Sequence, residues 1–245
     1  MKTLIHAHRG TPELCPENTL EGFAAAMEME ADCIELDVHL SKDGHIIVAH
    51  DARLERVSNG TGYINEHTLE ALRSLNFNQS HPEMAGSMHA PTLAEVFQLV
   101  QDSEIIVNID LKTTERHYPE LPEKLIALVQ EYAMQKRVLY SSFNHHSLVQ
   151  LKKHNQSAKI GLLYQVGLVD PWVYAKYIDA DAIHPHYSVI VAHPETVAQC
   201  HEYGVAVTVW TVDNPKAIQL MLQYGVDGII TNKLDAAIKC RDSLK

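Results

Sequence analysis

The 245-residue sequence predicts an α/β fold: a (β/α)₈ barrel of the TIM type with a small insertion after the second strand. Short β-branched runs alternate with helical patterns along almost the whole chain, which indicates right-handed βαβ units around a parallel sheet. About eight such units fit into a length typical of this barrel. Hydrophobic residues make up 46% of the chain and can fill a large core. A doubly wound open sheet is the alternative architecture.

The first β-strand is predicted at residues 3–8, and a helix follows within 16–30. From Leu20 onward, apolar residues recur at the i, i+3, i+4, i+7 spacing of one helix face. Asn18 and Glu21 have the spacing of a capping box, so we expect this helix to begin at Asn18.

The rest of the chain continues the alternation. Further strands are predicted at 33–40, 104–112, 137–143, 158–164, 181–186, 205–212 and 227–232. Helices are predicted between them, near 92–101, 119–135, 145–154, 170–178, 193–202, 214–224 and 233–242. Residues at about 51–90 carry Gly and Pro with only weak helical periodicity, so we expect an inserted segment there. No linker divides the chain, and a single catalytic domain over 1–245 is the simplest organisation.

Composition excludes several classes of protein. The net charge of −11 argues against nucleic-acid binding, which depends on Lys and Arg at phosphates. No apolar run is long enough for a membrane span or for a secretory signal. The four cysteines are scattered, with no C-x-x-C pair, as is usual in a reducing compartment. We therefore expect a cytoplasmic protein.

Polar side chains at two-residue spacing mark the predicted strand ends. They are His6 and His8 on the first strand, Glu35, Asp37 and His39 on the second, and Asn108, Asp110 and Lys112 on the third. Residues two apart share a face of a strand, and barrel enzymes gather their chemistry at the carboxyl ends of the strands. Three buried carboxylates, Glu35, Asp37 and Asp110, would need a cation or hydrogen-bonding partners. They predict a site for one hard divalent ion, Mg²⁺ or Ca²⁺. For any one of these acids, the alternative is a salt bridge to a neighbour such as Arg9 or Lys112.

Two of the 16 histidines are placed for catalysis. His8 lies at the tip of the first strand, and a hairpin after the second strand returns His50 to the same rim. Histidines on either side of an ion suit general acid–base work near neutral pH. Arg9 and Lys112 supply the local positive charge that could hold a phosphate. His6, deeper in its strand, is expected to be a hydrogen-bonded core residue.

These segments resemble the glycerophosphodiester phosphodiesterases of the bacterial cytoplasmic type over essentially the whole chain. The matching motifs are "HRG", "PENT", "ELDVHLSKDGHIIVAHD", "PTLAEVF", "NIDLK", "WTVDN" and "DGIITN". The resemblance implies a TIM barrel that hydrolyses glycerophosphodiesters, such as glycerophosphocholine or glycerophosphoethanolamine, to sn-glycerol 3-phosphate and an alcohol. It implies His8 and His50 as the acid–base pair and Glu35, Asp37 and Asp110 as ligands of one divalent ion. It further implies phosphate contacts from Arg9 and Lys112, support of that end by Glu17, and Trp210 on the glycerol side.

One motif departs from the family pattern. The third-strand segment usually reads N-I-E-x-K, and here it is "NIDLK". Asp110 is one methylene shorter than Glu, which withdraws the carboxylate by roughly 1.5 Å and leaves the metal preference open. Asp213 stands where Asn is common, which we interpret as a local capping change.

Other functions remain open at this point. The alternatives are a lysophospholipase D acting on lipids that keep one acyl chain, and a catalytically silent barrel that binds polyol phosphates. The expected partner is the small-molecule substrate, with no nucleic acid and no membrane span; a homodimer is one option for assembly.

Overall fold

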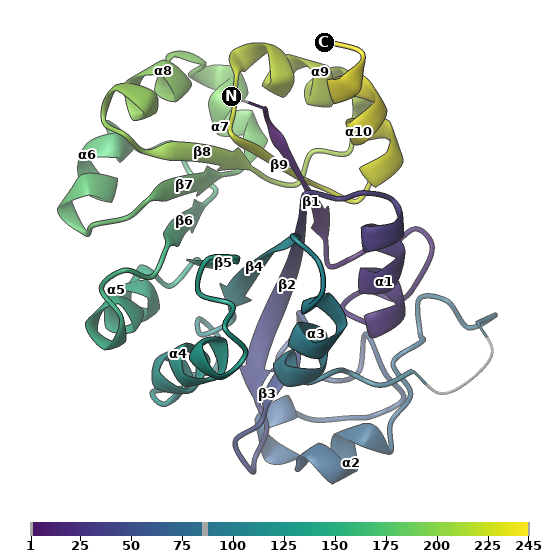
Figure 1. Cartoon of the computed structure of the whole chain (residues 1–245). Coiled ribbons are helices and arrows are strands. Elements are labelled where there is room, and N and C mark those ends of the chain that lie inside the picture. Colours follow the sequence, from purple (N-terminus) through teal and green to yellow (C-terminus); the bar gives the residue numbers. More distant parts are fainter. Residues whose placement is uncertain (1, 85–87, 245) are drawn as a thin grey trace.

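The computed structural model describes residues 2–84 and 88–244. Within these residues, eight parallel strands close into a barrel, as the sequence predicts (Figure 1). The strands are β1 Leu4–His8, β2 Cys33–Leu40, β4 Ile106–Leu111, β5 Val138–Ser142, β6 Ile160–Tyr164, β7 Ala182–Pro185, β8 Ala206–Val209 and β9 Gly228–Thr231. Since β1 pairs with both β2 and β9, the sheet has no free edge at this point, and the open-sheet alternative is wrong.

Helices cover the outside of the barrel (Figure 1). They are α1 Leu20–Glu28, α3 Leu93–Val100, α4 Leu121–Glu131, α5 His145–His154, α6 Pro171–Tyr177, α7 Tyr187–Ala192, α8 Glu195–Glu202, α9 Pro215–Tyr224 and α10 Leu234–Asp242. All except α7 fall within segments predicted to be helical. The six residues of α7 are too few to show a helical period, and the His186 side chain caps its start by accepting from the backbone N–H of Ser188.

The start of α1 differs from the expectation. Thr19, not Asn18, is the N-cap, and its side chain accepts a hydrogen bond from the backbone N–H of Gly22. Asn18 lies just before the helix with a φ of +58°. This left-handed conformation turns its side chain toward the barrel mouth, where the amide donates to Asp37 at 2.9 Å. The predicted cap is therefore one residue too early, because Asn18 serves a tertiary contact.

The insertion after β2 lies at the bottom of Figure 1. β3, Ile46–Val48, pairs antiparallel with the end of β2 and confirms the predicted hairpin. A 3₁₀ turn, Ile64–Glu66, and the helix α2, Leu69–Arg73, follow, while residues 85–87 of the segment lie outside the described part of the chain. The insertion has its own small core, formed by Ile47, Ala49, Leu54, Ile64, Leu72, Phe77 and Ala90.

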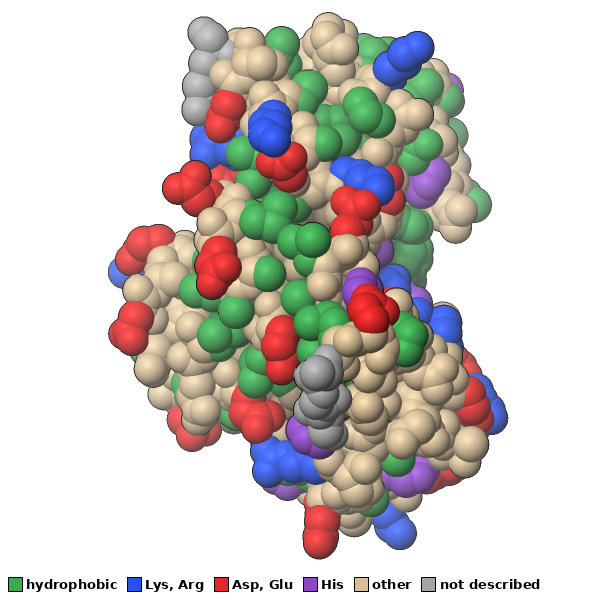
Figure 2. Space-filling view, turned by 90° about the vertical axis from the view of Figure 1, so that its right-hand side faces the viewer, with side chains coloured by type: hydrophobic (Ala, Val, Ile, Leu, Met, Phe, Trp, Pro, Cys, Tyr) green, Lys and Arg blue, Asp and Glu red, His purple; other side chains and the backbone are tan. Residues whose placement is uncertain are grey.

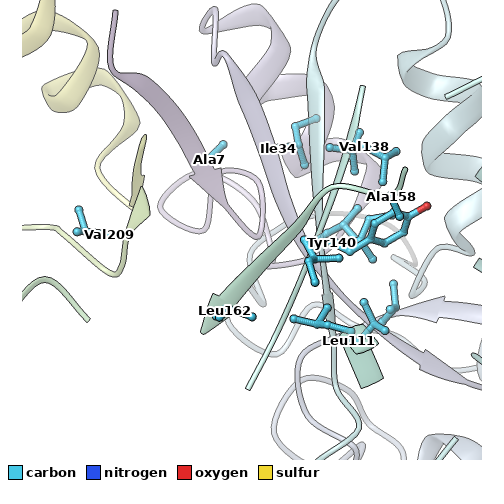
Figure 3. Packing of buried hydrophobic residues seen from close by; sticks show 14 of the residues in the cluster. Ala7, Ile34, Leu111, Val138, Tyr140, Ala158, Leu162 and Val209 are labelled. Atoms are coloured by element: carbon cyan, nitrogen blue, oxygen red, sulfur yellow. The ribbon is translucent and has the colours of Figure 1, made fainter. Parts of the chain in front are cut away.

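Strand alternation separates the main core from the barrel interior. On β2, Ile34, Leu36 and Val38 are fully buried in the cluster that also holds residues of the surrounding helices. Figure 3 shows members of this cluster, among them Ile34, Leu111 and Tyr140 from neighbouring strands. The alternate residues of β2, Glu35 and Asp37, therefore face the opposite side, toward the inside of the barrel. Packing of the outer face thus fixes the direction of the two carboxylates.

The outer surface is mixed in charge. On the face shown in Figure 2, acidic and basic side chains are interspersed, with hydrophobic side chains between them. This face is unlike the continuous basic surface that binds a phosphate backbone. Among the described residues, no helix is both long enough and apolar enough to cross a lipid bilayer.

Candidate active site

The three predicted carboxylates meet at the mouth of the barrel. Glu35 and Asp37 come from β2 and Asp110 from β4, and Asp37 and Asp110 are directly paired in the strand register. One oxygen atom from each of the three residues lies within 4.8 Å of the other two. All three residues are buried, with at most 5% of their surface exposed. The strand pairing thus brings together a compact all-oxygen cluster, which forms a candidate metal site.

The electrostatics of this cluster favour a cation. Burial and the charge of Asp37 raise the pKa of Glu35 well above its usual range, and burial raises the pKa of Asp110 to about 6. Burial also acts on Asp37, but the positive charges of Lys112 and Arg9 hold its pKa well below the usual range. Among the described residues, the Oδ1 atom of Asp110 has no hydrogen-bond partner. The negative charge here is incompletely balanced, and three carboxylates are a donor set that suits a hard divalent ion.

Arg9 is held beside the cluster by an unusual backbone. Its φ of +56° is in the left-handed region, which is rare for a side chain of this size and is often found at functional sites. The backbone N–H of Arg9 donates to Oε2 of Glu35 at 3.1 Å, while the guanidinium lies 3.5 Å from Asp37. The next residue, Gly10, has a φ of +86°, and a Cβ there would lie 2.8 Å from the backbone of Gly22 in α1. Only glycine permits this close approach.

A chain of alternating charges connects Arg9 to the insertion. Arg9 binds Glu17 at 3.1 Å, and Glu17 also accepts two hydrogen bonds of 2.8 Å from Arg56. Arg56 in turn binds Asp51 at 2.6 Å, and Asp51 accepts a 2.6 Å hydrogen bond from Nδ1 of His50. Glu17 therefore contacts Arg9, and it lies outside the lining of the cavity at the cluster.

His8 is oriented by Asn232, which lies near the C-terminal end of the chain. Its Nδ1 lies 2.7 Å from Oδ1 of Asn232, just after β9. The Asn232 amide is itself fixed, because its Nδ2 and backbone N–H both donate to Asp213. The amide oxygen must therefore face His8, which places the imidazole proton on Nδ1 and leaves Nε2 as the basic atom. Burial, together with the charge of Arg9, lowers the pKa of His8 to about 4.

His50 and Lys112 complete the polar residues of the mouth. Burial and the positive charges of Lys112 and Arg9 lower the pKa of His50, while the charge of Asp37 and the hydrogen bond to Asp51 oppose this effect. The backbone carbonyl of His50 accepts a hydrogen bond from Nε2 of His39, which is buried in β2. Lys112 lies 3.4 Å from Asp37 and 3.3 Å from Asp110, so its ammonium bridges two members of the carboxylate cluster.

Two adjoining cavities open at this point. The smaller, of about 90 Å³, contains the carboxylate cluster, and its lining includes His8, Arg9, His50, Lys112, Phe143 and Trp210. The larger, of about 450 Å³, extends toward the insertion and is lined by His39, His50, Asp51, Ala52, Arg53, Asp110, Leu111, Lys112, Thr114, Glu115 and Phe143. Except for Glu17, every residue predicted for catalysis, metal binding or substrate binding lines the smaller cavity.

Four contributors to this site carry no role in the sequence prediction. Asp51 and Arg56 hold His50, Asn232 orients His8, and Phe143 packs edge-to-face against Trp210 with ring centroids 5.3 Å apart. Asp51 and Asn232 lie at the ends of two of the motifs quoted above, which was an available signal. No pattern in the sequence points to Arg56, whose role depends on where the insertion folds.

Comparison with known proteins agrees with this geometry. The sequence model of the glycerophosphoryl diester phosphodiesterase family matches residues 8–236. A glycerophosphodiester phosphodiesterase of Caldanaerobacter subterraneus subsp. tengcongensis is 45% identical over 238 residues, covering 97% of both chains. One from Bacillus altitudinis is 37% identical over 244 residues, covering 99% of this chain and all of the other. The crystal structure of a glycerophosphodiester phosphodiesterase from Parabacteroides distasonis superimposes with a TM-score of 0.86 at 27% identity, covering 99% of this chain and 98% of the other.

Proposed function

This chain belongs to the glycerophosphoryl diester phosphodiesterase family and is a phosphodiester hydrolase; from that premise we propose that it cleaves glycerophosphodiesters to sn-glycerol 3-phosphate and a free alcohol. The observation that carries the proposal is the common cavity. It places His8 and His50 beside the carboxylate cluster, with Arg9 and Lys112 as cationic neighbours. One phosphodiester bound there would touch all of these groups.

Glu35, Asp37 and Asp110 would hold one divalent ion, Mg²⁺ or Ca²⁺. When bound, such an ion supplies positive charge next to the phosphate oxygens. Arg9 and Lys112 hold the same phosphate from the protein side, where fixed cations stabilise charge that develops during cleavage. The side chain of Asp110 reaches less far into the cavity than Glu would, so the choice between Mg²⁺ and Ca²⁺ depends on how the ion sits between the three carboxylates.

We assign the two proton transfers from the hydrogen bonds of each imidazole. His8 donates through Nδ1 to a neutral amide, and its low pKa keeps Nε2 unprotonated at neutral pH, so His8 accepts the proton of the attacking oxygen. His50 is bound to the carboxylate of Asp51, a partner that stabilises an imidazolium. An anionic phosphate bound between Arg9 and Lys112 also raises the pKa of nearby imidazoles. His50 then protonates the departing alcohol oxygen, whether water or the glycerol 2-hydroxyl attacks phosphorus.

A coupled assay for glycerol 3-phosphate tests this function. We expect turnover of glycerophosphocholine and glycerophosphoethanolamine that stops on chelation and returns on adding Mg²⁺ or Ca²⁺. His8→Ala and His50→Ala should each lower kcat by at least about 10²-fold, the usual range for one acid–base group, with unchanged circular dichroism. The matched control is His154→Ala, at the exposed end of α5. Wild-type turnover in both test variants would contradict the assignment.

One observation favours a second substrate class, the lysophospholipids. The insertion offers little apolar surface, since Met88 is buried, but Val166 and Val169 of the loop after β6 are 67% and 91% exposed. That loop follows Leu163, which lines the smaller cavity. An acyl chain on the glycerol could lie against these side chains. Comparing turnover of lysophosphatidylcholine with that of glycerophosphocholine decides between the two classes, and Val169→Ser should slow only the former.

The silent-barrel alternative is not retained, because the chain keeps both histidines in the cavity and belongs to a family of hydrolases. We expect the enzyme to act in the cytoplasm on free, water-soluble diesters. Sedimentation of the purified protein distinguishes a monomer from a homodimer, which is one option for its assembly.

A further inference from the structure

The larger cavity has no role in the catalytic assignments above. Its volume of about 450 Å³ is within the range of small-molecule sites. It shares His50, Asp110, Lys112 and Phe143 with the smaller cavity, so the two spaces are continuous at the reacting centre. A diester with its phosphate in the smaller cavity would therefore extend one of its two ester arms into the larger one.

The position of His50 identifies that arm. His50 lines both cavities, whereas His8 and Trp210 line only the smaller one. Since His50 is assigned to protonate the leaving oxygen, the leaving alcohol lies on the His50 side, in the larger cavity. The glycerol remains on the side of Trp210.

Most charges in the wall of the larger cavity are already paired. Asp51 is bound by His50 and Arg56, and Lys112 lies against two carboxylates of the cluster. Arg53 is paired with a neighbouring glutamate and stacks over a tyrosine ring. Glu115, by contrast, forms no ion pair with any of the described residues. The unbalanced charge of this wall is therefore negative.

An aromatic ring lies at the junction of the two cavities. Phe143 is 44% exposed, which is high for a phenylalanine, and only one edge contact, to Trp210, occupies it among the described rings. An open aromatic face attracts a cation, and a quaternary ammonium is a common ligand of such faces. An unpaired carboxylate and a free ring on one cavity are complementary to an alcohol that carries positive charge.

We propose that the larger cavity binds the leaving alcohol and that Glu115 and Phe143 make the enzyme prefer alcohols bearing an ammonium group over uncharged ones. This specificity rests on the proposed function and goes beyond it by naming the class of alcohol. Choline and ethanolamine have the required charge, whereas glycerol and inositol lack it.

The test compares kcat/KM for glycerophosphocholine and for glycerophosphoglycerol, whose leaving alcohol is uncharged. In Glu115→Gln, and separately in Phe143→Leu, we expect kcat/KM for glycerophosphocholine to fall about three- to five-fold, the effect of one exposed charge or cation–π contact. Turnover of glycerophosphoglycerol should change by less than about two-fold in Glu115→Gln. Phe143→Leu also removes the ring contact with Trp210, so for this variant the readout is a fall in the ratio of kcat/KM for glycerophosphocholine to kcat/KM for glycerophosphoglycerol. In the double variant, the ratio of kcat/KM for glycerophosphocholine to kcat/KM for glycerophosphoglycerol should fall about ten-fold. Glu120→Gln is the matched control, because it removes the same charge from the same connection but lies outside the cavity.

The outcomes separate the two proposals. An unchanged ratio of the two kcat/KM values in an active enzyme would overturn the alcohol pocket while leaving the phosphodiesterase function intact. Equal losses on both substrates would overturn the selectivity as well, since they indicate general damage to the site. Absence of turnover of either diester by the unmodified protein would end both proposals.

Discussion

Nδ1 of His8 lies 2.7 Å from Oδ1 of Asn232, although 224 residues separate the two in the chain. The contact forms because β1 and β9, the first and last strands of the barrel, are neighbours in the sheet. Asp213 accepts from both the side chain and the backbone of Asn232 and so prevents the amide from turning over. The expected capping role of Asp213 is therefore wrong: Asn214 caps α9, and Asp213 acts through Asn232 on the proton of His8.

Asn232→Ala should lower kcat by about 10²-fold, because the His8 ring loses the acceptor that fixes its tautomer. KM should change little, since neither residue carries positive charge toward the phosphate. The measurement is the steady-state rate of glycerol 3-phosphate release.

A paired exchange tests the same relationship by pH. Asn232→Asp combined with Asp213→Asn keeps an oxygen atom facing Nδ1 of His8, but this oxygen now belongs to a carboxylate. The negative charge of the carboxylate raises the pKa of the imidazole. A base must be neutral to act, so the acidic limb of the kcat/KM profile should move to higher pH. A profile that stays in place would show that Asn232 does not control His8.

Arg56→Ala should reduce kcat by about ten-fold, although Arg56 lines neither cavity. Its guanidinium joins Asp51 to Glu17, and without it the carboxylate that holds His50 is less well fixed. Arg73→Ala removes a similarly exposed arginine from an ion pair in the same insertion and is the control. Equal activities of the two variants would argue against the charge chain.

Asp110→Asn should weaken Ca²⁺ binding at least about ten-fold, because it removes one of the three carboxylates proposed to hold the ion. Titration calorimetry measures this without relying on turnover. The rise in melting temperature that Ca²⁺ gives the wild type should shrink accordingly, since binding to the native state stabilises it. Asp110→Glu, which restores the usual family residue, should keep binding and shift the Mg²⁺ to Ca²⁺ preference.

Stability should fall as the pH is lowered from 7 to 5, because two histidines are buried inside the barrel. His6 was expected to be hydrogen-bonded, but among the described residues neither its ring nor that of His184 has a hydrogen-bond partner. Burial lowers the pKa of His6 to about 4 and of His184 to about 3. The native state holds them neutral, so their contribution is complete above the unfolded pKa of about 6.5 and is lost below it. At pH 5 each of these two histidines should lower the free energy of unfolding by about 2 kcal/mol.

Urea unfolding at pH 7.5, 6 and 5 measures this dependence. His184→Leu should reduce the loss between pH 7.5 and 5 by about 2 kcal/mol, whereas His154→Leu, at an exposed position, should leave it unchanged. Identical pH dependence in all three proteins would mean that the buried rings are not responsible.

Gly161→Ala should destabilise the protein by about 1–3 kcal/mol, the usual effect of overpacking. A Cβ at this position in β6 would lie 2.4 Å from the ring of His184, which is fully buried. Gly167→Ala, where nothing lies within 4 Å of the new atom, is the matched control. The midpoint of urea unfolding should separate the two variants clearly.

Much of this molecule follows from local pattern. Alternation along β2 and β4 was sufficient to place Glu35, Asp37 and Asp110 on one face, because the apolar residues between them must be buried against the helices. The spacing of the hairpin likewise predicted the return of His50 to the rim. Both inferences rest on the two-residue period of a strand, which the sequence displays directly.

The sequence by itself therefore determined the barrel, the family and the residues that gather at its mouth. Only the tertiary structure decided that Thr19 caps α1 while Asn18 binds Asp37, that Arg56 ties Glu17 to Asp51, and that a second cavity adjoins the first. Those features depend on loops whose conformation has no period, and on contacts between residues far apart in the chain. Such residues come together only when the barrel closes and the insertion packs against it. The local conformational preferences of the backbone do not determine these long-range contacts.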